Sequence, residues 1–279
     1  RVRCHTPFRG CKTTQLMKRF GLMGHPIAHS LSPVLFTAAY GGRYPYELIE
    51  ESDFATAWKR FLEGYDGVNV TAPFKELAAS MDLLPSDEVS LTGATNLVVK
   101  TPLGLEAYNS DYRAVLRIIR DEERRRPLKK LLVVGCGGAA KAAAAAAYML
   151  EKEVVIANRS RGKAEEFASR LEMLALARPC SAQGSVSVCG IDSLPECDMC
   201  IYCLPLAIPA LESLSCGVFM EANYRDPACS EEFFERNGRK TVYISGEKWL
   251  LMQAVTGYAL FTGEPADTEA MVQAISRRY

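Results

Sequence analysis

A glycine-rich turn between two apolar runs constrains the fold of this chain more than any other feature. Residues 131–135 read LLVVG, residues 136–152 read CGGAAKAAAAAAYMLEK, and residues 153–158 read EVVIAN. A buried strand, a glycine turn, an alanine-rich helix and a second strand form a βαβ unit, because parallel strands need a crossover connection. Backbone N–H groups at the start of such a helix can face a pyrophosphate. The sequence therefore predicts a dinucleotide-binding unit, and a tight turn without a ligand is the alternative.

The end of the second strand indicates which dinucleotide is bound. Enzymes that use NAD place Asp or Glu about twenty residues after the first glycine, but Asn158 stands in that region and Arg159 follows it. A guanidinium complements a 2′-phosphate, and no carboxylate repels it, so the pattern favours NADP(H) over NAD. The alternative is a basic helix start that Ser160 caps. The expected cofactor-binding residues here are Gly135, Gly137, Gly138, Ala139, Asn158, Arg159, Ser160 and Lys163.

The rest of the chain alternates apolar runs with helical patterns. From Phe20 onward this alternation predicts a parallel or mixed sheet covered by helices. A charge-dense stretch at 121–130, DEERRRPLKK, reads as a solvated helix end and connector. After the βαβ unit, DMCIYCLP, GVFMEANY and KTVYIS are typical of further strands, and an apolar-periodic helix runs from Gly246 to about Phe261 before a last helix from Thr268.

Composition narrows the class of partner. The chain carries 33 basic and 33 acidic residues, which removes the electrostatic case for nucleic acid and leaves a small molecule as the expected partner. No membrane span or signal peptide is evident, so a cytoplasmic protein, monomeric or homodimeric, is expected. The ten cysteines are scattered, and the CxxC formed by Cys197 and Cys200 lacks a second pair. We expect free or buried thiols and no metal site.

Three polar motifs in the N-terminal half carry the functional signal. They are GHPIAHSLSP at 24–33, GVNVTAPFKE at 67–76, and TGATN at 92–96 with YNSD at 108–111. Together with the glycine turn they resemble the shikimate dehydrogenase family, whose patterns are HSxSP, NVTxPxK, GAxNT, NTD and GxGGxxxA. Their order and spacing match over nearly the whole chain from Phe20. The resemblance implies reversible, NADPH-dependent reduction of 3-dehydroshikimate to shikimate.

The resemblance also implies a role for individual residues. Lys75 and Asp111 are expected to form the catalytic pair. The expected substrate-binding residues are Ser30, Ser32, Thr71, Asn96, Tyr224 and Gln253, of which the two serines and the tyrosine hold the carboxylate. Residues 246–254, GEKWLLMQA, are similar to the family's GxxMLxxQA helix, and Gly246 in this motif is expected to contact the cofactor.

Physical chemistry supports the catalytic pair independently. Hydride addition to a ketone generates an alkoxide that needs a proton, and Lys75 can supply it while a neighbouring carboxylate such as Asp111 positions the ammonium. Taken singly, each residue also has a structural alternative. Ser30 and Ser32 could be helix caps, Lys75 a first-turn surface lysine and Asp111 the cap of the following helix. His25 and His29 are assigned to no chemical step.

The expected fold class is α/β, with an N-terminal α/β substrate domain, a Rossmann-like NADP-binding domain, and C-terminal helices that return to the first domain. We expect residues 1–18 to be a flexible extension, 19–115 with 243–279 to form the substrate-binding catalytic domain, and 116–242 to form the cofactor domain. The active site is expected in the cleft between them.

Three departures from the family pattern leave alternatives open. Phe36 and Thr37 replace a histidine-asparagine pair, Ala114 replaces a glycine, and the family's NxTPxGM loop against the nicotinamide appears as YCLPLAI at 202–208. One alternative is an NAD-using quinate/shikimate dehydrogenase. The other, motivated by the altered loop, is a catalytically weak paralogue that binds shikimate without turning it over.

Overall fold

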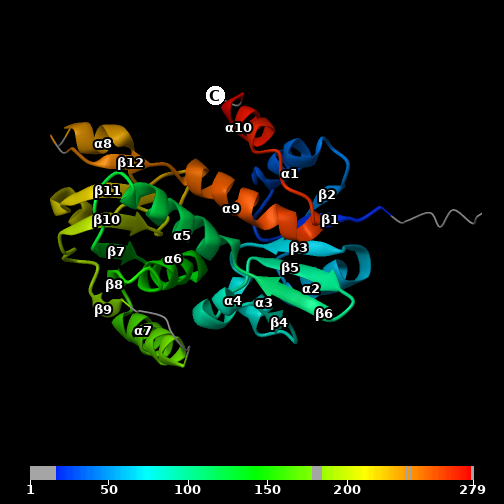
Figure 1. The fold of residues 1–279 in the computed structure, drawn as a ribbon, viewed down its shortest axis with the longest axis horizontal. Helices are drawn as coiled ribbons and strands as arrows, with labels where there is room; N and C mark the ends of the chain where they lie inside the picture. Colours follow the sequence, from blue (N-terminus) through cyan, green and yellow to red (C-terminus); the bar gives the residue numbers. More distant parts are fainter. Residues whose placement is uncertain (1–16, 178–183, 237, 239, 278–279) are drawn as a thin grey trace, which may run out of the picture.

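The computed structural model describes residues 17–177, 184–236, 238 and 240–277. The extension expected over 1–18 lies outside this described part except for its last two residues. The described chain forms two six-stranded sheets that lie side by side, with helices packed on their faces (Figure 1). This is the expected α/β class.

The first sheet is mixed and has the strand order β2-β1-β3-β5-β6-β4. Its strands are β1 (Phe20–Gly24), β2 (Tyr46–Glu50), β3 (Gly67–Val70), β4 (Leu84–Pro85), β5 (Leu97–Thr101) and β6 (Gly104–Tyr108). The helices of this half are α1 (Ser32–Tyr40), α2 (Phe54–Gly64), α3 (Lys75–Ala79) and α4 (Asp87–Thr92). Strands β1, β2 and β3 run parallel, whereas β5 pairs antiparallel with both β3 and β6. The β5–β6 hairpin therefore turns the chain back before α5.

The second sheet is parallel throughout and has the Rossmann-like order β12-β11-β10-β7-β8-β9. Its strands are β7 (Lys130–Val134), β8 (Glu153–Ala157), β9 (Ser185–Cys189), β10 (Cys197–Tyr202), β11 (Cys216–Glu221) and β12 (Val242–Ile244). Its helices are α5 (Ser110–Glu123), α6 (Gly138–Tyr148), α7 (Arg161–Leu176), the 3-10 helix η1 (Pro209–Ser213) and α8 (Glu231–Arg236). The βαβ unit expected from the glycine turn is present as β7, α6 and β8.

Alanines allow α6 to lie close to its sheet. Residues 142–147 are all alanine and are almost completely buried, and β7 is buried along four successive residues, 131–134, because helices cover both of its faces. The cluster that contains these alanines also includes Leu91 of α4. The two halves of the molecule therefore share part of one apolar core.

The C-terminal helices return to the first half, as expected. Helix α9 (Gly246–Thr262) runs from the second sheet towards the first, and α10 (Thr268–Ser276) lies against α1 (Figure 1). Tyr258 and Phe261 of α9 pack on Phe36 of α1, with ring centroids 4.9 Å and 6.1 Å apart. Phe36, at a position where the family carries a polar residue, is thus a core side chain.

Two details differ from the sequence-based expectations or leave them open. The stretch 121–130 is not wholly solvated, because Glu122 is buried at the end of α5 and lies 2.9 Å from the Arg125 guanidinium. The proposed domain division stays a proposal, and its boundary at 115/116 falls inside α5. No helix of the described chain is both long and apolar enough to cross a membrane.

Candidate active site

A cavity of about 420 Å³ lies where the two halves of the molecule and α9 meet. All eight residues that the sequence assigns to catalysis or substrate binding line it: Ser30, Ser32, Thr71, Lys75, Asn96, Asp111, Tyr224 and Gln253. Ala139 and Gly246, two of the expected cofactor-binding residues, line it as well. Segments far apart in the sequence therefore contribute polar groups to one space.

Lys75 and Asp111 form an ion pair at this cavity. Lys75 begins α3, Asp111 lies in the first turn of α5, and the two side chains are 17% and 6% exposed. Asn109, not Asp111, caps α5, because its Oδ1 accepts the Tyr112 N–H at 3.1 Å. The alternatives in which Lys75 is a surface lysine and Asp111 a helix cap are therefore wrong. Asp111 is left free to face the ammonium.

Asn96 links the start of α5 to α9. Its Oδ1 accepts the Ser110 N–H at 2.7 Å, and its Nδ2 donates to Ser110 Oγ at 3.0 Å and to Gln253 Oε1 at 3.4 Å. Asn96 is 3% exposed, so these bonds satisfy an amide that burial would otherwise penalise. They fix the start of α5 and hence the position of Asp111 beside Ser110.

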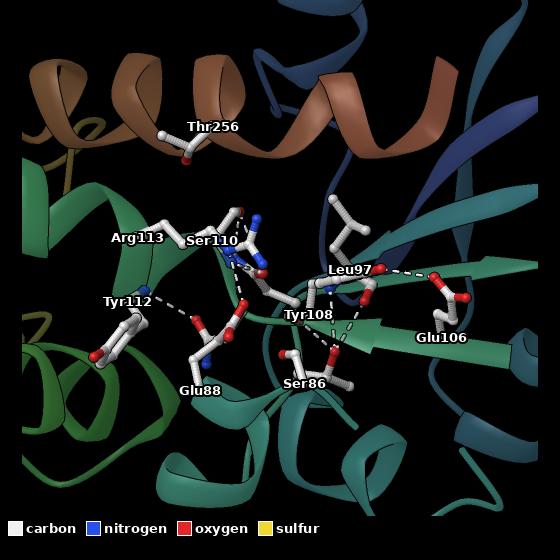
Figure 2. A network of polar contacts seen from close by, with 12 residues as sticks. Ser86, Glu88, Leu97, Glu106, Tyr108, Ser110, Tyr112, Arg113 and Thr256 are labelled. Carbon is white, nitrogen blue, oxygen red and sulfur yellow. Dashed lines mark hydrogen bonds and ion pairs between the residues drawn. The ribbon is translucent and has the colours of Figure 1, made fainter. Parts of the chain in front are cut away.

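Outside the cavity, a polar network holds the same region of α5. Figure 2 shows Ser110 and Arg113 projecting from α5, with Glu88 of α4 beneath them. Arg113 Nε donates to Glu88 Oε1 at 2.8 Å, and the guanidinium lies 5.1 Å from the Tyr108 ring centroid. These contacts tie α5 to α4 and β6, so the helix that carries Asp111 is held on both sides.

The two serines lie at the start of α1, and neither is its N-cap residue. The N-cap residue is Leu31, which makes no side-chain cap bond, and Ser32 is the first helical residue. The Ser32 N–H donates to Ser30 Oγ, the two hydroxyl oxygens are also 3.2 Å apart, and Tyr258 donates its hydroxyl to the Ser32 carbonyl at 3.2 Å. Burial raises the pKa of Tyr258, so this phenol stays a neutral donor.

Asn69, which lines the cavity, and Tyr46, which bonds to it from behind, were not identified from the sequence. Tyr46 donates its hydroxyl to Asn69 Oδ1 at 2.8 Å, and Asn69 Nδ2 donates to the Asn96 carbonyl at 3.2 Å. Burial raises the pKa of Tyr46 well above its usual value. The only sequence signal for Asn69 was its place in the motif at 67–76, and Tyr46 had none, because the cavity is assembled by tertiary contacts.

A buried carboxylate shapes the segment that presents Tyr224. Glu221 is fully buried, and its two oxygens accept the N–H groups of Asn223 at 2.9 Å and Ala228 at 3.0 Å. Burial raises the pKa of Glu221 although these N–H groups oppose the shift. A Cβ on Gly246 would lie 2.6 Å from the backbone of Asn223 and Tyr224. Only glycine therefore lets α9 begin against this segment.

The glycine turn approaches Lys75. Gly135 has a φ of +115°, a conformation that side chains rarely adopt, and a Cβ on Gly137 would meet nothing within 4 Å. On Gly138 a Cβ would lie 3.1 Å from Lys75 Cδ. The turn thus leaves open space at its second glycine and closes directly onto Lys75 at its third.

The remaining predicted cofactor residues lie at the end of β8 and the start of α7, away from the cavity. Asn158 Nδ2 donates to the Ser160 carbonyl at 2.8 Å, and Arg159, Ser160 and Lys163 are exposed. Ser160 stands at the N-cap of α7, as the alternative of a basic helix start expects, but its side chain makes no cap bond. The exposed basic groups remain available to an anion.

Two contacts hold the halves of the molecule together beside the cavity. Lys141 of α6 forms an ion pair with Glu76 of α3 at 2.8 Å, and Arg170 of α7 donates to the Ser90 carbonyl at 3.0 Å. Glu76 is the neighbour of Lys75. In the described residues no group of three or more histidine, cysteine or acidic side chains is arranged to hold a metal ion.

Comparison with known proteins places the chain in a family. Residues 22–98 match the family model described as the shikimate dehydrogenase substrate binding domain. A shikimate dehydrogenase (NADP(+)) of Xanthomonas euvesicatoria is 30% identical, over 94% of this chain and 96% of that protein.

Solved structures agree with this placement. The shikimate 5-dehydrogenase of Thermus thermophilus in complex with shikimate is 27% identical, with a TM-score of 0.78 over 94% of this chain and 99% of that one. A quinate dehydrogenase of Corynebacterium glutamicum in complex with NAD shares the fold, with a TM-score of 0.74 at 20% identity over 94% of this chain and 99% of that one. Since identity, coverage and fold agree along nearly the whole length, this chain belongs to the shikimate dehydrogenase family.

Proposed function

We propose that the chain is an NADP-dependent shikimate dehydrogenase that interconverts 3-dehydroshikimate and shikimate. The observation that carries this proposal is the Lys75–Asp111 ion pair, which faces a cavity lined by hydroxyl and amide groups. A ring that bears one carboxylate and several hydroxyls needs many hydrogen-bond partners, because unpaired polar groups in a closed site are costly. The shikimate dehydrogenases of Xanthomonas euvesicatoria and Thermus thermophilus support the same activity.

In this proposal the cavity wall orients the substrate. The hydroxyls of Ser30, Ser32 and Tyr224 bind the carboxylate, and the bond from the Ser30 hydroxyl to Ser32 Oγ, 3.2 Å long, leaves the Ser32 hydrogen free to donate. Thr71, Asn96 and Gln253 bind the ring hydroxyls. Since Asn96 is already bonded to Ser110 and Gln253, its position is set before substrate arrives, which lowers the entropic cost of binding.

The glycine turn fits a dinucleotide. The open space at Gly137 and the left-handed Gly135 leave room for a pyrophosphate against the N-terminus of α6. Gly138, Ala139 and Gly246 extend this surface into the cavity, and Asn158, Arg159, Ser160 and Lys163 would hold a 2′-phosphate. When bound, NADP(H) supplies the hydride donor or acceptor.

Lys75 and Asp111 handle the proton. In the reducing direction the Lys75 ammonium donates a proton to the substrate oxygen as negative charge develops there, and in the oxidising direction the neutral amine takes it back. Asp111, buried beside it, keeps the ammonium oriented and stabilises its charge. An acid–base group of this kind contributes about 10²- to 10⁴-fold in rate. The Lys141–Glu76 contact holds α6 against α3, which carries Lys75.

Two alternatives rest on particular observations. The likeness to an NAD-bound quinate dehydrogenase favours an NAD-using quinate/shikimate dehydrogenase, and Arg159 argues against it. The altered loop at 202–208 favours a paralogue that binds shikimate with little turnover.

The test is a turnover assay with the purified protein. Shikimate or quinate is mixed with NADP⁺ or NAD⁺, and the absorbance of reduced nicotinamide is followed. The proposal predicts the highest kcat/KM for shikimate with NADP⁺. Preference for quinate with NAD⁺ would establish the first alternative. Shikimate binding in a calorimetric titration without reduction of either dinucleotide would establish the second.

A further inference from the structure

The segment that departs most from the family pattern, residues 203–208, forms an ordered loop between β10 and η1. At its start the Cys203 N–H donates to the Val134 carbonyl at 2.9 Å, and at its end the Ile208 carbonyl accepts the Leu211 N–H at 3.1 Å. Between these anchors Leu204 and Ile208 pack on the apolar core of the second sheet. Leu206 lies between them with 75% of its surface exposed.

This loop lies beside the glycine turn and near the Lys75–Asp111 pair. Leu204 Cδ2 is 3.4 Å, and Cys203 Cβ 3.5 Å, from the position that a Cβ on Gly135 would take. Burial raises the pKa of the Cys203 thiol, and the charges of Asp111 and Lys75 act on the same group. The loop is therefore in contact with the glycine turn and within electrostatic range of the ion pair.

Tyr202, the last residue of β10, belongs to the apolar cluster on which this loop packs. Its ring is fully buried and stacks on Phe219, with centroids 5.8 Å apart at 28°. Its hydroxyl donates to the Leu206 carbonyl at 2.6 Å, and the Ile208 N–H is directed at the Tyr202 hydroxyl oxygen. The buried Tyr202 side chain thus bonds to the backbone of Leu206, whose own side chain is largely exposed.

We propose that Tyr202 is a positioning residue whose hydrogen bond to Leu206 holds the 203–208 loop in the conformation required at the cofactor site. This inference rests on the proposed function. In this chain a tyrosine occupies a position where the family pattern has asparagine, and its hydroxyl supplies a bond to the loop tip from the neighbouring core. The substitution then preserves an ordered loop instead of abolishing cofactor binding.

The size of the effect follows from one hydrogen bond. Without the hydroxyl, the exposed Leu206 segment loses its bond to the core. The entropic cost of ordering the loop then lowers the affinity for the cofactor. The net contribution of a neutral hydrogen bond corresponds to a roughly two- to tenfold change in an equilibrium constant. We therefore expect loop opening to increase, and cofactor affinity to fall, by about that factor.

The experiment compares Tyr202→Phe with a matched control, Tyr243→Phe. Tyr243 lies in the same apolar cluster, stacks on the other side of Phe219 at 6.2 Å, and donates its hydroxyl to the Cys229 carbonyl at 2.8 Å. Both variants keep the ring and lose one hydroxyl-to-carbonyl bond, but only the first bond belongs to the loop. The readouts are hydrogen–deuterium exchange of the peptide covering 203–208 without ligand, and calorimetric titration with NADP⁺ and with shikimate.

The expected result is faster exchange of the loop peptide and weaker NADP⁺ binding in Tyr202→Phe, each by about two- to tenfold, with shikimate affinity unchanged and Tyr243→Phe like the wild type. Unchanged exchange or unchanged NADP⁺ affinity in Tyr202→Phe overturns the inference, as does an equal loss in Tyr243→Phe. A wild type that binds no NADP⁺ overturns the proposed function as well, and that outcome is visible without any variant.

Discussion

Replacement of Gly138 by alanine tests how closely the glycine turn constrains Lys75, the proposed proton donor. Gly138 is the first residue of α6 and its φ lies outside the left-handed region, so an alanine suits its backbone. The added Cβ would lie 3.1 Å from Lys75 Cδ, whereas two carbon atoms are at their optimal separation at about 3.5–4.0 Å. The Lys75 side chain therefore has to move by about 0.4–0.9 Å.

The expected loss of activity follows from this displacement. Cδ lies two bonds before the ammonium nitrogen, so the ammonium moves by a similar distance relative to Asp111 and the cavity. A misplacement of about 1 Å at a reacting centre costs up to about 10²-fold in rate, and we expect kcat to fall by about 10- to 100-fold. Stability should not fall with it, because glycine to alanine in a helix gains up to about 1 kcal/mol, which offsets the strain.

The assay measures kcat at saturating shikimate and NADP⁺, with thermal unfolding in parallel. Gly64→Ala is the control, because Gly64 also lies in a helix, α2, and a Cβ there meets nothing within 4 Å. It should leave kcat unchanged. A Gly138→Ala enzyme with kcat within twofold of the wild type would refute the claim that Lys75 must hold this position.

Further predictions concern other parts of the site. Trp249 lines the cavity, whereas Trp58 lies in the core around α2. The change in intrinsic fluorescence on shikimate binding should therefore vanish in Trp249→Phe and persist in Trp58→Phe. The reverse pattern would contradict the cavity assignment. Lys141→Met removes the ion pair with Glu76 but keeps the apolar stem. It should lower kcat/KM by about two- to fivefold at low salt and by less at 0.5 M NaCl, because salt screens the pair in the wild type. A loss of kcat/KM that is the same at both salt concentrations would contradict this. Because burial raises the pKa of Glu221, its contribution to stability is present below the ordinary carboxyl pKa and is lost as pH rises through the folded value. Urea unfolding from pH 4 to 7 should show a smaller loss of stability with rising pH in Glu221→Gln, and equal slopes would refute this.

The sequence predicted the fold best where periodicity and turn chemistry coincide. LLVVG, the alanine run and EVVIAN could hardly form anything other than β7, α6 and β8. The β5–β6 hairpin was not identified, because its strands lie between two polar motifs and join through the short turn after Thr101. Strand β9 was also missed, since SVSVC is a half-exposed edge strand without a long apolar run.

The site was predictable only in part, for a different reason. Motif order identified eight residues that line the cavity. The sequence suggested Asp111 as a possible cap of α5 and did not single out Asn109, although either side chain suits that role. In the sequence, residues 202–208 lack the asparagine and the glycine of the family's NxTPxGM pattern. That the Tyr202 hydroxyl bonds to the Leu206 carbonyl depends on the stacking of its ring on Phe219, which no local pattern encodes.

The most direct test of the account is the rate of NADP⁺ reduction by Lys75→Met with saturating shikimate, measured beside calorimetric shikimate binding and circular dichroism. If Lys75 transfers the proton, the variant folds, still binds shikimate, and has a kcat lower than that of the wild type by about 10²- to 10⁴-fold. A folded Lys75→Met protein that reduces NADP⁺ within a few-fold of the wild-type rate would contradict the assignment of proton transfer to Lys75.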